Sequence, residues 1–127
     1  MIGYHTIWDI YDCNADKLKF VEPIKIILNT VVNELRLGKV SESYKQFEPF
    51  GATGFILLEE SHISIHTWPE HQFAAIDVFS CKPFDTAAIV ELLSSYFETN
   101  SITSKIIERG SIPEKKIVTT LDTIINV

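Results

Sequence analysis

Residues 59–70 carry the sequence Glu59-Glu60-Ser61-His62-Ile63-Ser64-Ile65-His66-Thr67-Trp68-Pro69-Glu70. Two histidines, two serines, several carboxylates and a Trp-Pro pair are gathered in this short segment. Apolar runs at 54–58 and 73–79 flank it on both sides. Polar and apolar residues alternate along its middle part, which is typical of a strand. Such a density of reactive groups within a sheet predicts a functional site.

The strand periodicity limits how two of these groups can cooperate. Side chains of a regular strand alternate between the two faces of the sheet, so Ser61 and His66 are expected on opposite faces. If both act on the same group, the chain must turn or bulge between them. A break at Glu60-Ser61 would supply that freedom.

The composition is that of one globular domain spanning residues 1–127, with 46% hydrophobic and 22% charged residues. A formal net charge of −6 argues against non-specific nucleic-acid binding, which needs a basic surface. The start of the sequence does not resemble a signal peptide, and no run is long enough to span a bilayer. Together with two cysteines, Cys13 and Cys81, these features predict a cytoplasmic protein with reduced thiols.

Periodicity predicts two helices. One begins at Glu22-Pro23 and covers 22–37, with Gly38 as its C-terminal stop. The other is capped by Asp85-Thr86 and ends near Asn100. Strands are predicted over 4–12, 39–48, 54–58, 72–81 and 102–108, and the continuous apolar run at 54–58 is typical of a buried strand. Residues 15–21 remain open, and 111–127 fit an added strand, a helix or a partner-binding tail.

The order of elements is strand, helix, three strands, helix, strand. Two helices cannot cover both faces of a sheet whose strands are joined mainly by hairpins. We therefore expect an α+β fold, a two-layer α-β sandwich with a mainly antiparallel sheet and both helices on one face. The other face would be available for a partner subunit or a ligand.

Simpler site types fit the central segment poorly. His62 and His66 are four residues apart, a spacing that suits a metal ion on a helix but not on a strand, so no metal site is predicted. Ser61 and His66 lack the Gly-x-Ser-x-Gly elbow of a serine hydrolase. Cys81 follows a strand and is either buried filler or an acid or nucleophile beside a cleft.

Aromatic residues near the segment have two interpretations. Each is more often part of a core, but a cluster facing a cleft would suit a flat heteroaromatic ring. The residues concerned are Trp8, Tyr44, Phe47, Phe50 and Trp68.

Residues 60–70, followed by Ala74-Ala75-Ile76-Asp77-Val78-Phe79-Ser80-Cys81, resemble the short prokaryotic S-adenosylmethionine decarboxylase proenzyme family. The similarity extends to Gly3-x-His5, Tyr11-Asp12-Cys13 and Glu108-Arg109-Gly110, so it covers roughly residues 3–110. Members of this family make a covalent pyruvoyl cofactor from one of their own serines.

The resemblance implies self-cleavage at Glu60-Ser61. The Ser61 hydroxyl would attack the carbonyl of Glu60 in an N→O acyl shift, and elimination would release a β chain of residues 1–60. The dehydroalanine left at position 61 would lose ammonia and become the pyruvoyl group of an α chain of residues 61–127. His66 matches the family's processing histidine. The pyruvoyl ketone would form a Schiff base with the substrate amine, and the adjacent carbonyl would accept electrons.

Further roles follow from the same resemblance. Cys81 matches the acid that reprotonates the substrate, Phe47 the residue that stacks on adenine, and Glu70 the carboxylate that holds the ribose hydroxyls. Thr53 stands where the family has a serine that assists the acyl shift. A threonine hydroxyl can still hydrogen-bond an oxyanion, although its methyl group restricts its rotamers.

The implied function is decarboxylation of S-adenosylmethionine, which supplies the aminopropyl donor for spermidine biosynthesis. The implied assembly is a homodimer of αβ units. A pyruvoyl-dependent arginine or ornithine decarboxylase is an alternative, because the core motif serves any α-amino acid, but Phe47 and Glu70 favour a nucleoside. An unprocessed regulatory homologue is a further alternative.

Overall fold

The computed structural model describes residues 2–110, and the alternatives for 111–127 lie outside them. Six strands and two α-helices make up the fold. In chain order the elements are β1 (Gly3–Tyr11), η1 (Ala15–Lys17), α1 (Val21–Leu35), β2 (Lys39–Gln46), β3 (Ala52–Leu58), β4 (His62–Trp68), η2 (Pro69–His71), β5 (Phe73–Ser80), α2 (Thr86–Phe97) and β6 (Ser101–Arg109). Neither α1 nor α2 has the length and apolarity needed to cross a membrane.

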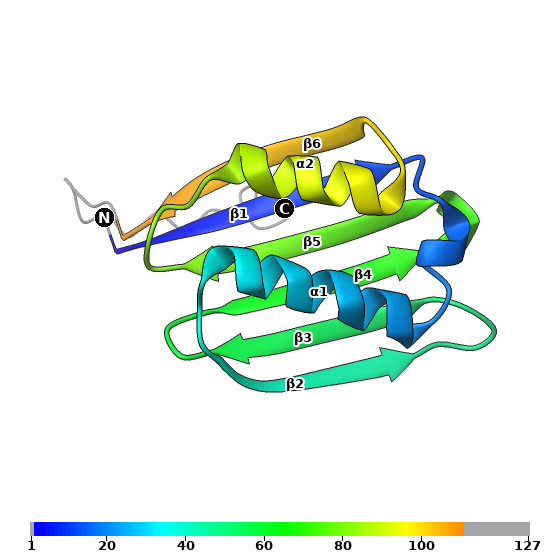
Figure 1. Ribbon diagram of the computed structural model, residues 1–127, viewed down its shortest axis with the longest axis horizontal. Coiled ribbons are helices and arrows are strands. Elements are labelled where there is room, and N and C mark those ends of the chain that lie inside the picture. The colour runs from blue at the N-terminus through cyan, green and yellow to red at the C-terminus, as the bar shows by residue number, and fades with distance from the viewer. Residues whose placement is uncertain (1, 111–127) are drawn as a thin grey trace, which may run out of the picture.

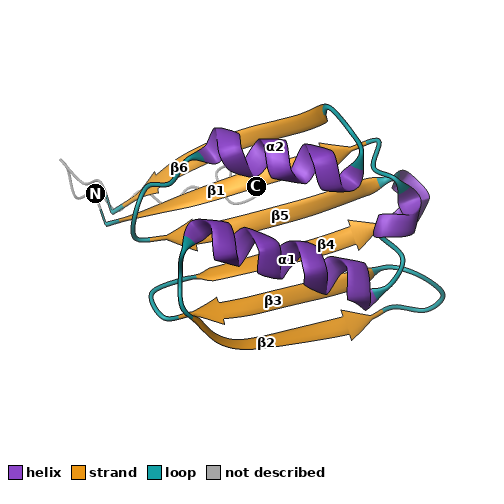
Figure 2. Cartoon of the chain, in the orientation of Figure 1, coloured by secondary structure: helices purple, strands orange, loops and turns teal. Residues whose placement is uncertain are grey.

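The strands form one sheet in the order β2-β3-β4-β5-β1-β6, and every neighbouring pair is antiparallel. Both helices lie side by side on the same face of this sheet (Figures 1 and 2). The expected two-layer α-β sandwich is confirmed. The expected count of three strands between the helices is wrong, because a turn at Glu59-Glu60 divides that part of the chain into four.

The core lies between the helices and the covered face of the sheet. Helices α1 and α2 bury one apolar stripe each, as their three- and four-residue spacing predicts. Fully burying such a side chain contributes about 1.5–3 kcal/mol. The principal core residues are Trp8, Ile10, Ile24, Ile27, Leu28, Val31, Ile56, Ile63, Ile65, Ile76, Val78, Ile89, Leu93 and Phe97.

Both helices end earlier than their periodicity predicts. Helix α1 ends at Leu35, because Arg36 adopts the left-handed conformation with φ 56° and bonds its N–H to the carbonyl of Asn33. Gly38 is therefore not the helix stop. Its lack of a side chain makes room for Glu59, since a Cβ there would approach the Glu59 Cδ to 2.7 Å. Helix α2 ends at Phe97, three residues before Asn100.

Within residues 2–110, no element covers the face of the sheet opposite the helices. Strand β3 shows this most clearly, because its apolar residues alternate in burial rather than being buried together. Ile56 is fully buried against the helices, whereas Phe55 and Leu57 are 41% and 42% exposed. The prediction of a buried strand at 54–58 is therefore wrong for one of its two faces. We call this uncovered side of the sheet the open face.

Glu42 ties the edge strand β2 to helix α1. Its carboxylate accepts hydrogen bonds from Asn29 Nδ2 at 3.0 Å, Lys39 Nζ at 3.0 Å and the Tyr44 hydroxyl at 2.8 Å. The bonds from Asn29, Lys39 and Tyr44 favour the ionised form and lower the pKa of Glu42 to about 2.

We expect Glu42→Gln to alter the acid stability of the fold. A carboxyl whose pKa is lowered from 4.5 to about 2 by folding stabilises the native state above pH 4.5 and loses this contribution as the pH falls toward 2. The variant should be less stable than wild type at neutral pH, by under about 1 kcal/mol for a group this near the surface. Urea unfolding at several pH values measures the difference, which should vanish in acid. Glu91→Gln, at an exposed position on α2, is the control that should keep the wild-type pH dependence.

Candidate active site

The residues singled out from the sequence gather in two groups at opposite ends of β4. The hairpin cluster, at the start of the strand, consists of Glu60, Ser61 and Cys81. The pocket cluster lies where β4 passes into η2. It consists of Phe47, Thr53, His66, Trp68 and Glu70.

The hairpin cluster is built on a tight turn between β3 and β4. The N–H of Leu58 donates to the carbonyl of Ser61 at 2.9 Å, and the N–H of Ser61 donates to the carbonyl of Leu58 at 3.2 Å. Ser61 is only 8% exposed, and its Oγ is buried without a hydrogen-bond partner among the described residues. An unpartnered buried hydroxyl is rare in native proteins and calls for a specific explanation, of which a catalytic role is one. The predicted scissile bond thus lies at a turn. The hydroxyl of Ser61, next to this bond, has no hydrogen bond to another described residue.

Cys81 meets the same turn from the end of β5. Strand β5 pairs with β4, with Phe79 opposite His62, and so brings position 81 beside the hairpin. The Cys81 thiol donates to the carbonyl oxygen of Glu60 at 3.2 Å. Its exposure excludes the interpretation as core filler.

Cys13 is the core cysteine of this chain. It is fully buried and its thiol donates to the carbonyl of Ile10 at 3.5 Å. Burial raises the pKa of Cys13 to about 11, so this thiol stays protonated near neutral pH. The two cysteines therefore have different environments, and only Cys81 lies beside other reactive groups.

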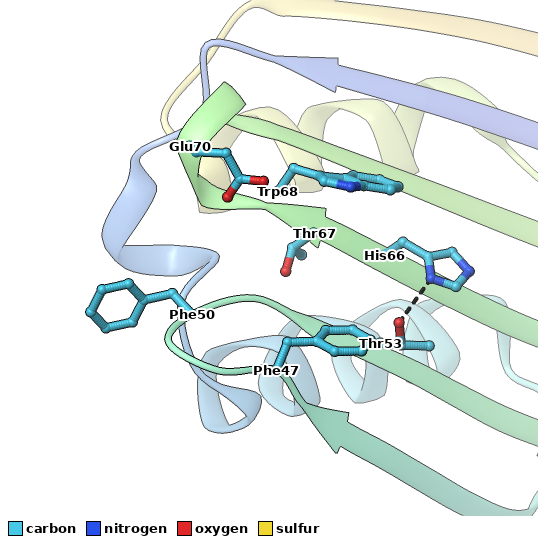
Figure 3. A pocket seen from close by; sticks show the side chains of 7 residues that line it. All are labelled: Phe47, Phe50, Thr53, His66, Thr67, Trp68 and Glu70. Carbon is cyan, nitrogen blue, oxygen red and sulfur yellow. Dashed lines mark hydrogen bonds between the residues drawn. The ribbon is translucent and has the colours of Figure 1, made fainter.

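The pocket cluster surrounds a cavity of about 300 Å³, a size within the range of small-molecule sites. Phe47 and Trp68 lie on opposite sides of it, with Glu70 at one end and Thr53 and His66 at the other (Figure 3). The two rings offer flat apolar surfaces, and the carboxylate offers acceptor oxygens. Phe50 also lines the rim, but Figure 3 shows its ring pointing away from this space.

Thr53 and His66 are directly opposite each other on β3 and β4. The Thr53 Oγ1 and His66 Nδ1 are 2.9 Å apart, so the hydroxyl orients the imidazole ring. The Trp68 ring lies next to that of His66, with centroids 6.1 Å apart, and against Phe73 at 5.6 Å. From the sequence, Trp68 was only one of several aromatic residues that could belong either to the core or to a cleft. Its position two residues from His66, and so on the same face of the strand, was the signal that could have placed it in the site.

Ser61 and His66 are not brought together within one chain. Strand β4 pairs with β3 in regular register from His62 to His66, without a bulge. Five residue steps of extended chain place the backbones of positions 61 and 66 about 16 Å apart. Ser61 is buried in the hairpin before β4, whereas His66 is exposed on the open face. The expectation that a regular strand places Ser61 and His66 apart therefore holds within one chain. The chain does bend at Glu59-Glu60, but this bend precedes Ser61 and does not bring the two groups together.

Aromatic rings also stack on the open face beside the hairpin cluster. The His62 ring lies between Phe55 and Phe79, with centroid distances of 5.4 and 6.0 Å and interplanar angles of 23° and 15°. The guanidinium of Arg109 lies over the ring of Phe79, 5.8 Å from its centroid. His62, the residue after Ser61, is therefore held firmly in place.

Comparison with known proteins gives one consistent family. The S-adenosylmethionine decarboxylase family model matches residues 4–110. An S-adenosylmethionine decarboxylase proenzyme of Persephonella marina is 43% identical over 97% of this chain and 93% of its own length. One from a Sulfurihydrogenibium species is 45% identical over 88% of this chain and 85% of its own length.

A solved structure agrees with these relatives. The crystal structure of the adenosylmethionine decarboxylase from Aquifex aeolicus superposes with a TM-score of 0.78 and 38% sequence identity, covering 92% of this chain and 98% of that one. The resemblance seen in the sequence is therefore confirmed over nearly its full extent. The chain belongs to the S-adenosylmethionine decarboxylase family.

Proposed function

We propose that the protein cleaves itself at Glu60-Ser61 and then decarboxylates S-adenosylmethionine, producing the aminopropyl donor for spermidine biosynthesis. The observation that carries the proposal is the unpartnered, buried Ser61 hydroxyl beside a peptide carbonyl held by the Cys81 thiol. The products would be a β chain of residues 1–60 and an α chain of residues 61–127. The free Cys81 thiol supports action in a reducing compartment such as the cytoplasm.

Cleavage uses groups of the hairpin cluster. Ser61 Oγ attacks the carbonyl carbon of Glu60, the C–N bond breaks as an ester forms, and the hydroxyl proton passes to the nitrogen of residue 61. The Cys81 thiol, which donates to the attacked carbonyl, stabilises the developing negative charge on its oxygen. A base then removes the α-proton of residue 61, the Cβ–Oγ bond breaks, and Glu60 leaves as a carboxylate. The elimination leaves a dehydroalanine at position 61. Water hydrolyses its imine form, ammonia leaves, and a pyruvoyl group remains.

The hairpin cluster fits this covalent cofactor. Ser61 provides the carbon skeleton, and its hydroxyl has no competing hydrogen bond among the described residues. When formed, the pyruvoyl group supplies a ketone that binds the substrate amine and a neighbouring carbonyl that accepts electrons as CO2 leaves. Cys81 lies beside the cleaved bond and is suited to return a proton to the substrate α-carbon.

The pocket cluster supports a nucleoside substrate. A purine ring fits between the flat faces of Phe47 and Trp68, and the Glu70 carboxylate can accept hydrogen bonds from two ribose hydroxyls. A sulfonium cation is attracted to aromatic faces and to a chain with a net charge of −6. Arginine and ornithine have no flat ring system to fill the space between the two aromatic walls.

The separation of the two clusters supports a homodimer of αβ units. If two copies pack their open faces together about a two-fold axis, the hairpin cluster of each can face the pocket cluster of the other. Exposed apolar side chains, including Phe47, Phe55, Leu57 and Trp68, give this face the character of an interface. Each complete site would then use Ser61 and Cys81 of one copy with Thr53 and His66 of its partner.

We expect the purified wild-type protein to consist of two chains and Ser61→Ala to remain one chain of 14.4 kDa. The alanine has no hydroxyl to attack the Glu60 carbonyl. Mass spectrometry distinguishes the two states. Ser64→Ala, which removes the serine within β4, is the matched control and should cleave normally. A wild-type chain that stays intact contradicts the proposed self-cleavage.

CO2 release tests the substrate assignment. Processed enzyme should act on S-adenosylmethionine and not on arginine or ornithine supplied in parallel. Glu70→Gln should raise KM about tenfold or more, because hydrogen bonds to a charged acceptor are weakened. Glu34→Gln, at an exposed position on α1, should leave KM unchanged. Release of CO2 from arginine or ornithine alone assigns the protein to the alternative activity.

Co-expression of two inactive chains tests the shared site. Ser61→Ala alone should not cleave, and His66→Ala alone should cleave slowly or not at all. A mixed dimer has one complete site, formed by Ser61 of the His66→Ala chain and His66 of the Ser61→Ala chain. We therefore expect differently tagged chains to restore cleavage of the His66→Ala chain only. No restoration in isolated mixed dimers contradicts a site shared between copies.

A further inference from the structure

The Leu58–Ser61 pair that closes the β3–β4 hairpin has a property that matters only after cleavage. Its two backbone hydrogen bonds run in opposite directions across the turn. The bond from the Ser61 N–H depends on the nitrogen that leaves as ammonia in the proposed function. The bond from the Leu58 N–H, at 2.9 Å, goes to the carbonyl oxygen of residue 61, which remains. Cleavage therefore removes one bond of the pair and preserves the acceptor of the other.

We propose that the backbone N–H of Leu58 is the hydrogen-bond donor that stabilises negative charge on the electron-accepting carbonyl at position 61. The inference rests on the proposed function, in which that carbonyl stands next to the new ketone. A donor already in place needs no reorganisation when charge develops on its acceptor. Leu58, on the β chain, would thus donate a hydrogen bond to the cofactor on the α chain.

The donor is anchored independently of the cleaved bond. The Leu58 side chain is 2% exposed and packs in the core, and its backbone pairs with Lys39 of β2. The next residue, Glu59, donates its N–H to the carbonyl of Gly38 at 2.9 Å. Its carboxylate fills the space that Gly38 leaves open. The new end of the β chain is therefore held at residues 58 and 59, and only Glu60 is released.

The acceptor is anchored on the other side of the cut. The carbonyl of residue 61 shares its amide with the nitrogen of His62, the first residue of β4. His62 is paired with Leu57 on one side and Phe79 on the other. Its ring is also stacked between Phe55 and Phe79. These contacts fix the amide plane, so the 2.9 Å contact with the Leu58 N–H is retained when the hairpin is opened.

Replacing a single backbone N–H by oxygen tests this donor. The α-hydroxy acid analogue of leucine, placed at position 58 by codon suppression, gives a backbone ester that lacks the N–H and keeps the side chain. The corresponding analogue of glutamate at position 59 is the matched control. It removes the neighbouring N–H, which bonds to Gly38 instead of residue 61. Serine labelled with carbon-13 at its carbonyl carries the label to residue 61 and to the other serines. The infrared difference spectrum between each ester variant and wild type therefore isolates the carbonyl whose hydrogen bond changes in the processed enzyme.

We expect the ester at position 58 to shift the labelled carbonyl to higher frequency, because a hydrogen bond to its oxygen is lost. The kcat should fall about tenfold or more with little change in KM, as for loss of a donor that acts mainly as charge develops. The ester at position 59 should leave the frequency and kcat near wild type. An unchanged carbonyl frequency at position 58, or equal effects of the two esters, overturns the proposal.

Amide hydrogen exchange gives a second measurement that needs no backbone variant. The Leu58 N–H should be protected in uncleaved Ser61→Ala and equally protected in processed wild type. Fast exchange of this amide after cleavage overturns the proposal even if the esters fail to fold. The two hypotheses also fail differently: an uncleaved wild-type chain contradicts the proposed function, whereas a cleaved enzyme with an exposed Leu58 amide contradicts only the role of this donor.

Discussion

Strand β4 runs without a bulge from His62 to Trp68, and its pleat sends Ile63 and Ile65 into the core beneath the helices. A shift of one residue would move these isoleucines to the open face, so the packing of the core fixes the register. The same register fixes Ser61 in the hairpin before one end of the strand and His66 on the open face near the other. The arrangement of the reactive groups is thus a consequence of core packing, and it is what makes a second copy of the chain necessary in the proposed function.

Helical periodicity was sufficient to predict α1, α2 and their placement on one face of an antiparallel sheet. It was not sufficient to predict where each helix ends, because Arg36 and Glu98 adopt left-handed conformations that sequence preferences assign to glycine. Glycine at position 38 was explained wrongly for a related reason, since the Glu59 side chain that needs the space is distant in sequence. The exposure of Phe55 and Leu57 was also missed, because an apolar run does not reveal that one face of a strand lacks a covering layer.

Within the site, the sequence was most informative where the chemistry is local. The residues themselves indicated that a break in the chain at Glu60-Ser61 was needed beside a strand-like segment. The contact between the Cys81 thiol and the Glu60 carbonyl could not, because it depends on how β5 pairs with β4. Phe47, Thr53 and Glu70 were assigned through resemblance alone, and the fold places all three around one cavity. The distance between that cavity and Ser61 follows only from the complete register of the sheet.

The order of the strands gives the proposed cleavage an unusual outcome. Residues before the cut supply β1, β2 and β3, and those after it supply β4, β5 and β6, yet β1 lies between β5 and β6. The two fragments are consequently interleaved, joined along the β3–β4, β5–β1 and β1–β6 edges. Neither fragment can be withdrawn intact while the sheet persists. Once unfolded, the fragments must find each other again by diffusion, so maturation converts a unimolecular folding reaction into a concentration-dependent one.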